Sequence, residues 1–183
     1  MLDAGLFNAI NEAYADLDLG NDHTQYKFIE IQADNLSDAA LRQAITDAGT
    51  TTQDDIIVLH TTATQNKITL GGTELLININ AEQWGSVTIV SLGEMPLTID
   101  ANQESGVLSI GGNTVALAGL TITGGFSDYG GGGIGVGGSN VKLTITQCII
   151  SGNTANGQGG GIYSEISGSN PGATAGLTIR LVA

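Results

Sequence analysis

The chain of 183 residues carries a formal net charge of −13 at pH 7 and contains only five Lys and Arg residues. Nucleic acids and anionic membranes are bound through clustered basic side chains, so this composition argues against both as partners. Hydrophobic residues make up 41 % of the chain but aromatic residues only 4 %, which predicts a core of Val, Ile, Leu and Ala between closely stacked strands.

Membrane and disulfide-bonded classes are also disfavoured. No stretch approaches the ~18 consecutive apolar residues of a membrane span, so we expect no membrane insertion in this segment. Residues 1–14 lack the basic and apolar regions of a secretory signal, so an exported protein would have lost its signal or the chain would be a fragment. Cys148 is the single cysteine and is interpreted as a small buried hydrophobe.

The first 50 residues predict two helices with a strand between them. Apolar residues at three- and four-residue steps indicate one amphipathic helix; they are Leu2, Leu6, Ile10, Tyr14 and Leu17. QYKFIEIQ at 25–32 alternates as a strand does. A second helix follows, with Asn35 or Ser37 as its cap and Gly49 as its stop. Its apolar face consists of Leu41, Ala44, Ile45 and Ala48.

From Asp55 onward the pattern changes to short β-branched runs separated by Gly, Asn and Ser. Alternating apolar positions within such runs indicate strands, and the intervening residues indicate turns. The runs are DIIVL, KITL, LLININ, VTIV, LTID, VLSI, LTIT, KLTIT and LTIR.

These runs repeat along the chain. LTITGG at 120–125 aligns with CIISGN at 148–153, and GGGI at 131–134 aligns with GGGI at 159–162. The two alignments share one offset, from 120 to 148 and from 131 to 159, which we call the main repeat step. A shorter step leads from LTID at 97 to LTIT at 120, and a longer one from LTI at 143 to LTI at 177. The longer step contains a polar loop with Pro171, where an insertion is tolerated.

A repeat of this kind predicts an all-β solenoid in which each coil carries three short strands that pair in parallel with the coils above and below. Inward side chains would stack in columns, each burial contributing ~1.5–3 kcal/mol. The predicted columns are Ile122 over Ile150, Leu117 over Ile145 and Ile134 over Ile162. Asn153 and Gly159–Gly161 are interpreted as corners that favour positive φ.

The repeats resemble those of bacterial surface and outer-membrane proteins with polymorphic-type repeats. The motifs that carry this resemblance are LTITGG, GGGI, CIISGNTA and GGGIYS. LSDAALRQAI at 36–45, followed by DDIIVL, resembles the CSLREA-type region that precedes such repeats, although it lacks the family's Cys. Together the resemblances cover roughly residues 35–182. They imply a right-handed parallel β-helix, a pectate-lyase-like solenoid, with a small helical N-terminal cap.

This interpretation divides the chain into a helical and mixed cap at 1–54 and β-helix coils at 55–183. Leu36, Leu41 and Ile45 are expected to plug the first coil, since an open strand edge invites aggregation. LTIRLVA ends after the second strand of a coil without a polar cap. We therefore expect a longer protein, or a partner that covers this edge.

No metal or cofactor motif is complete. Gly133, Gly135 and Gly138 have the spacing of a dinucleotide-binding loop, but a strand follows them instead of a helix, so they are interpreted as a solenoid corner. A calcium roll would need an Asp after these glycines, and none follows. Asp16, Asp18 and Asp22 lack the Gly and Glu of a calcium loop, which leaves a solvated turn as the better interpretation and weak calcium binding as the alternative.

Catalytic constellations are also incomplete. The carboxylates of the β region do not align at the repeat steps; they are Glu74, Glu82, Glu94, Asp100, Glu104, Asp128 and Glu165. Lys142 aligns with Gly176, so it is only approximately stacked with Arg180. His23 and His60 lie outside any nucleophile motif. His60 closes the first apolar strand and is interpreted as a partly buried, hydrogen-bonded residue. Thr144 and Thr146 align with alanines, so no threonine ladder of an ice-binding face forms. We predict no catalytic, cofactor-binding or metal-binding residue.

The function that follows from the resemblance is a non-enzymatic structural or adhesive segment of an exported bacterial surface protein, extracellular or at the cell surface. The alternative is a carbohydrate-active or carbohydrate-binding β-helix whose site lies outside this segment. The expected partners are a glycan, another cell-surface protein, or a second copy of the chain that associates end to end or at the C-terminal edge.

Overall fold

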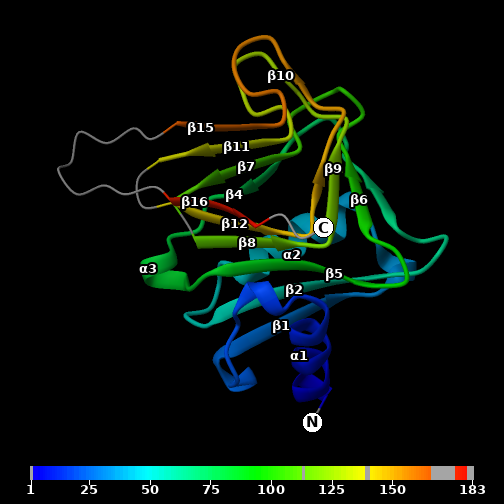
Figure 1. Ribbon diagram of the computed structural model, residues 1–183, viewed down its shortest axis with the longest axis vertical. Coiled ribbons are helices and arrows are strands. Elements are labelled where there is room, and N and C mark those ends of the chain that lie inside the picture. The colour runs from blue at the N-terminus through cyan, green and yellow to red at the C-terminus, as the bar shows by residue number, and fades with distance from the viewer. Residues whose placement is uncertain (1, 113, 139–140, 166–175, 181–183) are drawn as a thin grey trace.

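The computed structural model describes residues 2–112, 114–138, 141–165 and 176–180, and it is dominated by parallel β-sheets (Figure 1). The N-terminal region contains α1 (Leu2–Ala13), η1 (Ala15–Leu17), η2 (His23–Gln25), β1 (Tyr26–Ile31), η3 (Ala33–Asn35) and α2 (Asp38–Ala48). The polar loop around Pro171 that was predicted as an insertion lies outside the described residues.

Three sheets contain most of the strands. Sheet A has the order β1, β2 (Asp54–Thr61), β5 (Val87–Gly93), β8 (Thr114–Ala118), β12 (Lys142–Thr146) and β16 (Gly176–Arg180). Sheet B consists of β3 (Lys67–Thr69), β6 (Leu97–Asp100), β9 (Leu120–Thr123) and β13 (Ile149–Ile150). Sheet C consists of β4 (Leu75–Ile77), β7 (Leu108–Gly111), β11 (Ile134–Gly137) and β15 (Ile162–Glu165). Each sheet is open, with two edge strands.

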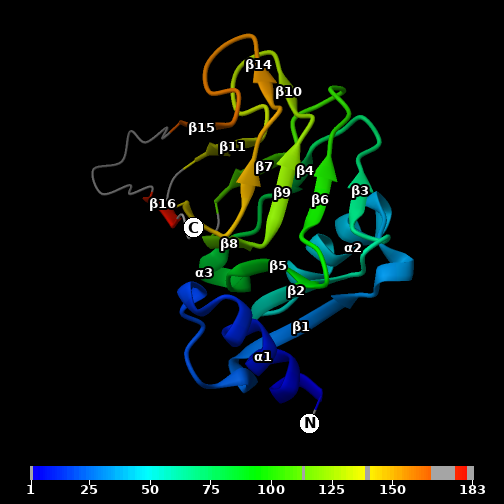
Figure 2. The same cartoon turned by 45° about the vertical axis from the view of Figure 1, so that its right-hand side comes forward.

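From β2 onward the chain passes through sheets A, B and C in succession and then returns to sheet A, and we call each such circuit a turn. Figure 2 shows β3, β6 and β9 of sheet B side by side as successive passes of this path. Every strand pairing in the described part of the chain is parallel. β10 (Phe126–Ser127) and β14 (Thr154–Ala155), which the sequence analysis missed, form a small extra pair, and α3 (Ala81–Trp84) precedes β5.

The predicted columns are confirmed. Ile122 pairs with Ile150, Leu117 with Ile145, and Ile134 with Ile162, each across the main repeat step. The first residue of each pair is fully buried, while Ile150 and Ile162 are partly buried against the same core.

The shorter and longer steps are confirmed as well. LTID at 97 pairs with LTIT at 120 as β6 with β9, and LTI at 143 pairs with LTI at 177 as β12 with β16. The strands therefore stay in register although the connections between them differ in length.

Helix α2 closes one end of this core. Its buried residues are the predicted Leu41, Ala44, Ile45 and Ala48. They belong to the same apolar cluster as the strand columns, and Leu36 packs against it. Of the two predicted caps, Ser37 is the one used, since its hydroxyl accepts a hydrogen bond from the Ala40 N–H.

The strand predicted at 25–32 is confirmed as β1, and it joins sheet A beside β2. Tyr26 pairs with Asp54, so the main repeat step also separates β1 from β2. Within this first turn, α2 occupies the part of the chain that later turns devote to strands of sheets B and C. The N-terminal region therefore supplies both a strand of sheet A and the helix that closes its core.

Helix α1 differs from the prediction at its C-terminal end. It ends at Ala13, and the predicted stripe residues Tyr14 and Leu17 lie in the following irregular segment and in η1. Phe7, which the predicted stripe omitted, is 2 % exposed. It packs with Ile10 and Tyr14 against the outer face of sheet A, so β2 and β5 are covered on both faces.

The corner interpretation is confirmed in part, since Gly159 has a positive φ but Gly160, Gly161 and Asn153 do not. Gly131 and Gly159 have φ of +72° and +62°, a conformation that a residue with a Cβ rarely adopts. Asn153 does not have a positive φ. Its side-chain amide donates to the Ile122 carbonyl at 2.9 Å and accepts from the Gly125 N–H at 2.8 Å, so it joins two successive turns.

Candidate functional site

The three carboxylates considered for calcium are not assembled into a site. Asp16 lies in η1, Asp18 follows it in a left-handed conformation, and Asp22 caps η2. Hydrogen bonds from Thr24 and Gln25 lower the pKa of Asp22 below its usual value. Across residues 2–112, 114–138, 141–165 and 176–180, no group of three or more His, Cys, Asp or Glu residues is placed to hold a metal ion.

The carboxylate of Asp100 is engaged in structural contacts. Lys67 Nζ lies 2.7 Å from its Oδ2, and the Asn102 N–H donates to Oδ1 at 2.8 Å. The Lys67 hydrogen bond, followed by that of Asn102, lowers the pKa of Asp100. A carboxylate held in this way stabilises the β6–β7 connection and is poorly suited to accept a proton.

The remaining sequence candidates are also dispersed. Lys142 pairs with Gly176 and Thr146 with Arg180, so the two basic residues occupy different rows of sheet A, as predicted. His60, predicted to be partly buried and hydrogen-bonded, places Nε2 2.8 Å from Glu30 Oε2 on the neighbouring strand. Gly135 of the dinucleotide-like motif lies within strand β11, where the prediction had placed a corner.

One buried charge was missed by the sequence analysis. Asp55 on β2 is fully buried between Lys27 on β1 and Val87 on β5. Its Oδ1 makes no hydrogen bond within the described residues, and the Lys27 Nζ lies 4.0 Å away. Burial raises the pKa of Asp55 to about 6, against the opposing effects of Lys27 and Thr51. The signal was present, because alternation along β2 puts Asp55 on the same face as Ile57.

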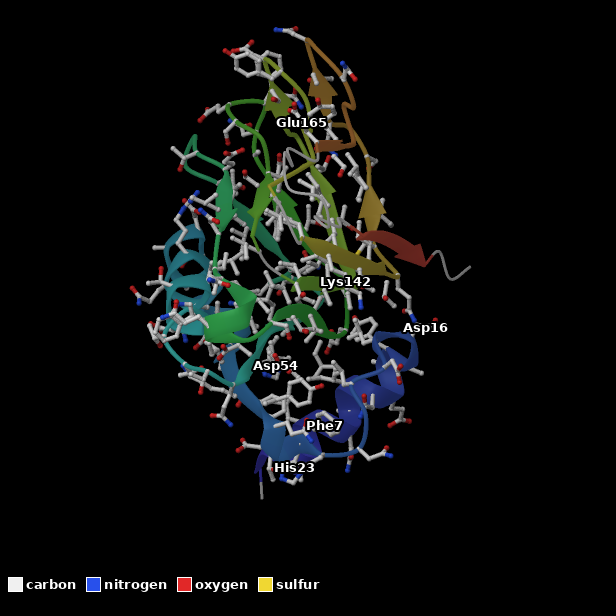
Figure 3. The ribbon with its side chains drawn as sticks, turned by 90° about the vertical axis from the view of Figure 1, so that its left-hand side faces the viewer. Phe7, Asp16, His23, Asp54, Lys142 and Glu165 are labelled. Carbon is white, nitrogen blue, oxygen red and sulfur yellow. The ribbon has the colours of Figure 1, made fainter. Side chains whose placement is uncertain are left out.

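The clearest hollow lies between η1 and the outer face of sheet A, and we call it the η1 hollow. It measures about 150 Å³. Thr88, Ala116 and Thr144 form its floor, Leu17, Leu19 and Tyr26 form a wall, and Lys142 and Asp18 also line it. Figure 3 shows the η1 segment, marked by Asp16, beside β12, whose first residue, Lys142, is labelled.

A second, shallower depression covers the outer face of sheet C. Its volume is about 500 Å³, and it is lined by Leu76, Asn78, Ser109, Ile110, Gly111, Gly112, Gly137 and Gly138. Leu76 is 58 % exposed there. A Cβ added at Gly135 or Gly137 would meet no atom closer than 3.9 Å, so packing within the chain does not require glycine at either position.

Comparison of the chain with protein-family models, with curated proteins and with solved structures finds no match in any of the three. No helix among the described residues is long and apolar enough to cross a membrane. The site must therefore be interpreted from its own geometry.

Proposed function

We propose that the chain is a right-handed parallel β-helix that serves as a stiff, non-enzymatic structural or adhesive segment of an exported bacterial surface protein. The observation that carries this proposal is the cyclic path through sheets A, B and C, in which strands of successive turns pair in register across the main repeat step. Crossover connections between parallel strands are right-handed in about 98 % of cases, which supports the handedness.

A stacked path of this kind suits a spacer. Each turn rests on its neighbours through strand hydrogen bonds and apolar columns, so turns can be added along one axis without a change in the local packing. The outer faces present rows of side chains at the strand spacing of ~4.8 Å, and such rows match ligands with a regular repeat. The expected partners remain a glycan, another cell-surface protein, or a second copy.

Three carboxylates are held by neighbouring side chains, which supports a non-enzymatic role. Lys67 holds Asp100, Arg42 holds Asp38 at 2.8 Å, and Asn156 donates to Asp128 at 2.9 Å. Acid–base hydrolysis of a glycosidic bond needs two carboxylates that converge on one substrate atom. The rival proposal of a carbohydrate-active β-helix places its site in another segment.

The surface location rests on the resemblance of the LTITGG and CIISGN repeats and of the LSDAALRQAI region to exported bacterial proteins. An acidic surface with a charge of −13 is well solvated and resists non-specific association.

An adhesion assay tests the proposal. Beads that carry the purified chain are expected to bind bacterial cells or an immobilised glycan panel more strongly than beads that carry an acidic globular control protein. The chain is expected to release no reducing ends from soluble polysaccharides. Release of reducing ends that is lost on mutation of a carboxylate would favour the rival, and beads that bind nothing would reduce the proposal to a scaffold.

A further inference from the structure

The floor of the η1 hollow is set by strand register. Thr88 on β5 pairs with Ala116 on β8, and Ala116 pairs with Thr144 on β12. Since neighbouring strands lie ~4.8 Å apart, the two threonines are about 10 Å from each other. The short side chain of Ala116 lies between them and leaves the space that the hollow occupies.

Thr88 contributes a hydroxyl to this floor. The residue is only 4 % exposed and lines the hollow, and its hydroxyl forms no hydrogen bond with any described residue. Two other lining hydroxyls do have one, because Ser86 donates to Asp54 and Tyr26 donates to the Leu19 carbonyl. The hydroxyl of Thr88 is therefore available to a group that enters the hollow.

Lys142 adds a positive charge at the same place. It is exposed, and no carboxylate of the described chain lies within ion-pair distance of its ammonium group. Lys27, Arg42 and Lys67 in contrast each have an Asp within 4.0 Å. Lys142 can accordingly pair with a negative group from outside the chain. Asp18 also lines the hollow and disfavours a second negative charge there.

The volume and the lining of the η1 hollow indicate the kind of ligand that fits it. A cavity of ~150 Å³ holds one six-membered ring, and the η1 hollow measures about 150 Å³. Leu17 and Leu19 offer an apolar surface to the C–H face of such a ring, while the threonines offer hydrogen bonds to its hydroxyls.

We infer that the η1 hollow binds one pyranose ring that carries a single carboxylate, that is, a hexuronate residue of a glycan. The ring lies on Ala116, its hydroxyls reach Thr88 and Thr144, and its carboxylate pairs with Lys142. This inference rests on the adhesive form of the proposed function, for which it supplies a ligand class and a site.

The test is a titration of the folded chain with methyl glucuronide and, separately, with methyl glucoside, which differ only in the group on C5. Amide resonances are followed by NMR. Saturable shifts are expected at Thr88, Ala116 and Thr144, with a dissociation constant on the order of 1 mM for the glucuronide and roughly tenfold weaker binding of the glucoside.

Three variants sharpen the result. Lys142→Gln is expected to reduce glucuronide binding to the level of the glucoside, and Ala116→Leu, which fills the hollow, is expected to abolish both. Lys67→Gln is the matched control, since Lys67 lies on sheet B, and it is expected to change neither affinity. Thermal unfolding curves identify any variant that fails to fold. If Ala116→Leu fails to fold, Lys142→Gln, which changes an exposed residue, still tests the inference by itself.

The outcomes separate the inference from the proposed function. Absence of saturable shifts at the η1 hollow while the beads still adhere overturns the inference alone. Equal binding of both sugars, unchanged by Lys142→Gln, overturns the acidic-sugar assignment. Glucuronide binding at the hollow without bead adhesion supports the inference and overturns the adhesive role.

Discussion

The first turn of the core, from β1 to β2, and the later turn from β8 to β12 span the same main repeat step but are built differently. In the later turns one inward column of sheet A consists of Val87, Val115 and Leu143. In the first turn the same column contains Lys27 and Asp55, and α2 replaces two strands. A turn inside the stack has a template on both sides, whereas the first turn has a neighbour on one side only and needs a different element to close it.

The largest effect is expected from breaking that closure. Leu41→Asp places a carboxylate without a partner in the fully buried position of α2, and we expect a loss of about 4–5 kcal/mol of unfolding free energy together with aggregation. Ala39→Asp, on the exposed side of the same helix, is expected to stay within about 0.5 kcal/mol of the wild type. Urea unfolding and size-exclusion chromatography measure both. A Leu41→Asp protein as soluble and as stable as the wild type contradicts the plug.

The second-largest effect is expected from a substitution that disrupts the contact between two later turns. A Cβ at Gly132 would overlap the Thr154 carbonyl oxygen and lie 2.8 Å from the Gly160 carbonyl oxygen, both in the next turn. We therefore expect Gly132→Ala to lower the unfolding free energy by about 2–3 kcal/mol, measured by urea unfolding. A loss below about 0.5 kcal/mol would mean that these turns are not in close contact.

The third prediction concerns the charge that distinguishes the first turn. Because the pKa of Asp55 is raised to about 6 in the folded chain from 3.8, the folded state holds this proton more tightly than the unfolded state. The stabilisation is present below about pH 4 and is lost as the pH rises through about 6. Relative to Asp55→Asn, the wild type should lose about 3 kcal/mol of unfolding free energy over this range.

Urea unfolding at a series of pH values measures this difference. Lys27→Gln removes the ammonium group that lowers the pKa of Asp55, so this variant should lose its stability at a higher pH than the wild type. A free-energy difference between wild type and Asp55→Asn that does not change with pH would show that Asp55 is solvated.

The smallest expected effect contrasts two glycines of one turn. Gly135 on β11 has no positive φ, and the nearest atom to an added Cβ is the Leu108 carbonyl oxygen at 3.9 Å. Gly135→Val should therefore raise the unfolding free energy by about 0.5–1 kcal/mol, because Val prefers the extended backbone and pairs across the sheet with Tyr163. A destabilisation as large as that of Gly132→Ala would show that position 135 faces the interior.

The comparison also explains what the sequence could predict. The register of the later turns was predictable because residues that share a column repeat with the same chemistry, as in Leu117 and Ile145. The apolar face of α2 was predictable from its helical spacing. The place of β1 in sheet A was not, because α2 interrupts the repeat between Tyr26 and Asp54.

The η1 hollow could not be predicted either. It arises where Leu17 and Leu19 cross the outer face of sheet A and meet Thr144, which is far away in the chain. None of the repeat steps relates Leu17 or Leu19 to Thr144. The hydrogen bonds of the Asn153 amide between turns were not predictable for a related reason, because Asn in a glycine-rich segment resembles a turn residue.

The most direct measurement is an NOE spectrum of the methyl-labelled chain that reports which side chains touch in the core. Stacked parallel turns predict methyl–methyl contacts between residues one turn apart, for Leu117 with Ile145 and for Ile134 with Ile162, and amide contacts between Thr121 and Ile149. Close Hα–Hα contacts typical of antiparallel strands between β9 and β13, or an Ile134 methyl group in contact with solvent alone, would contradict the stacked-turn account.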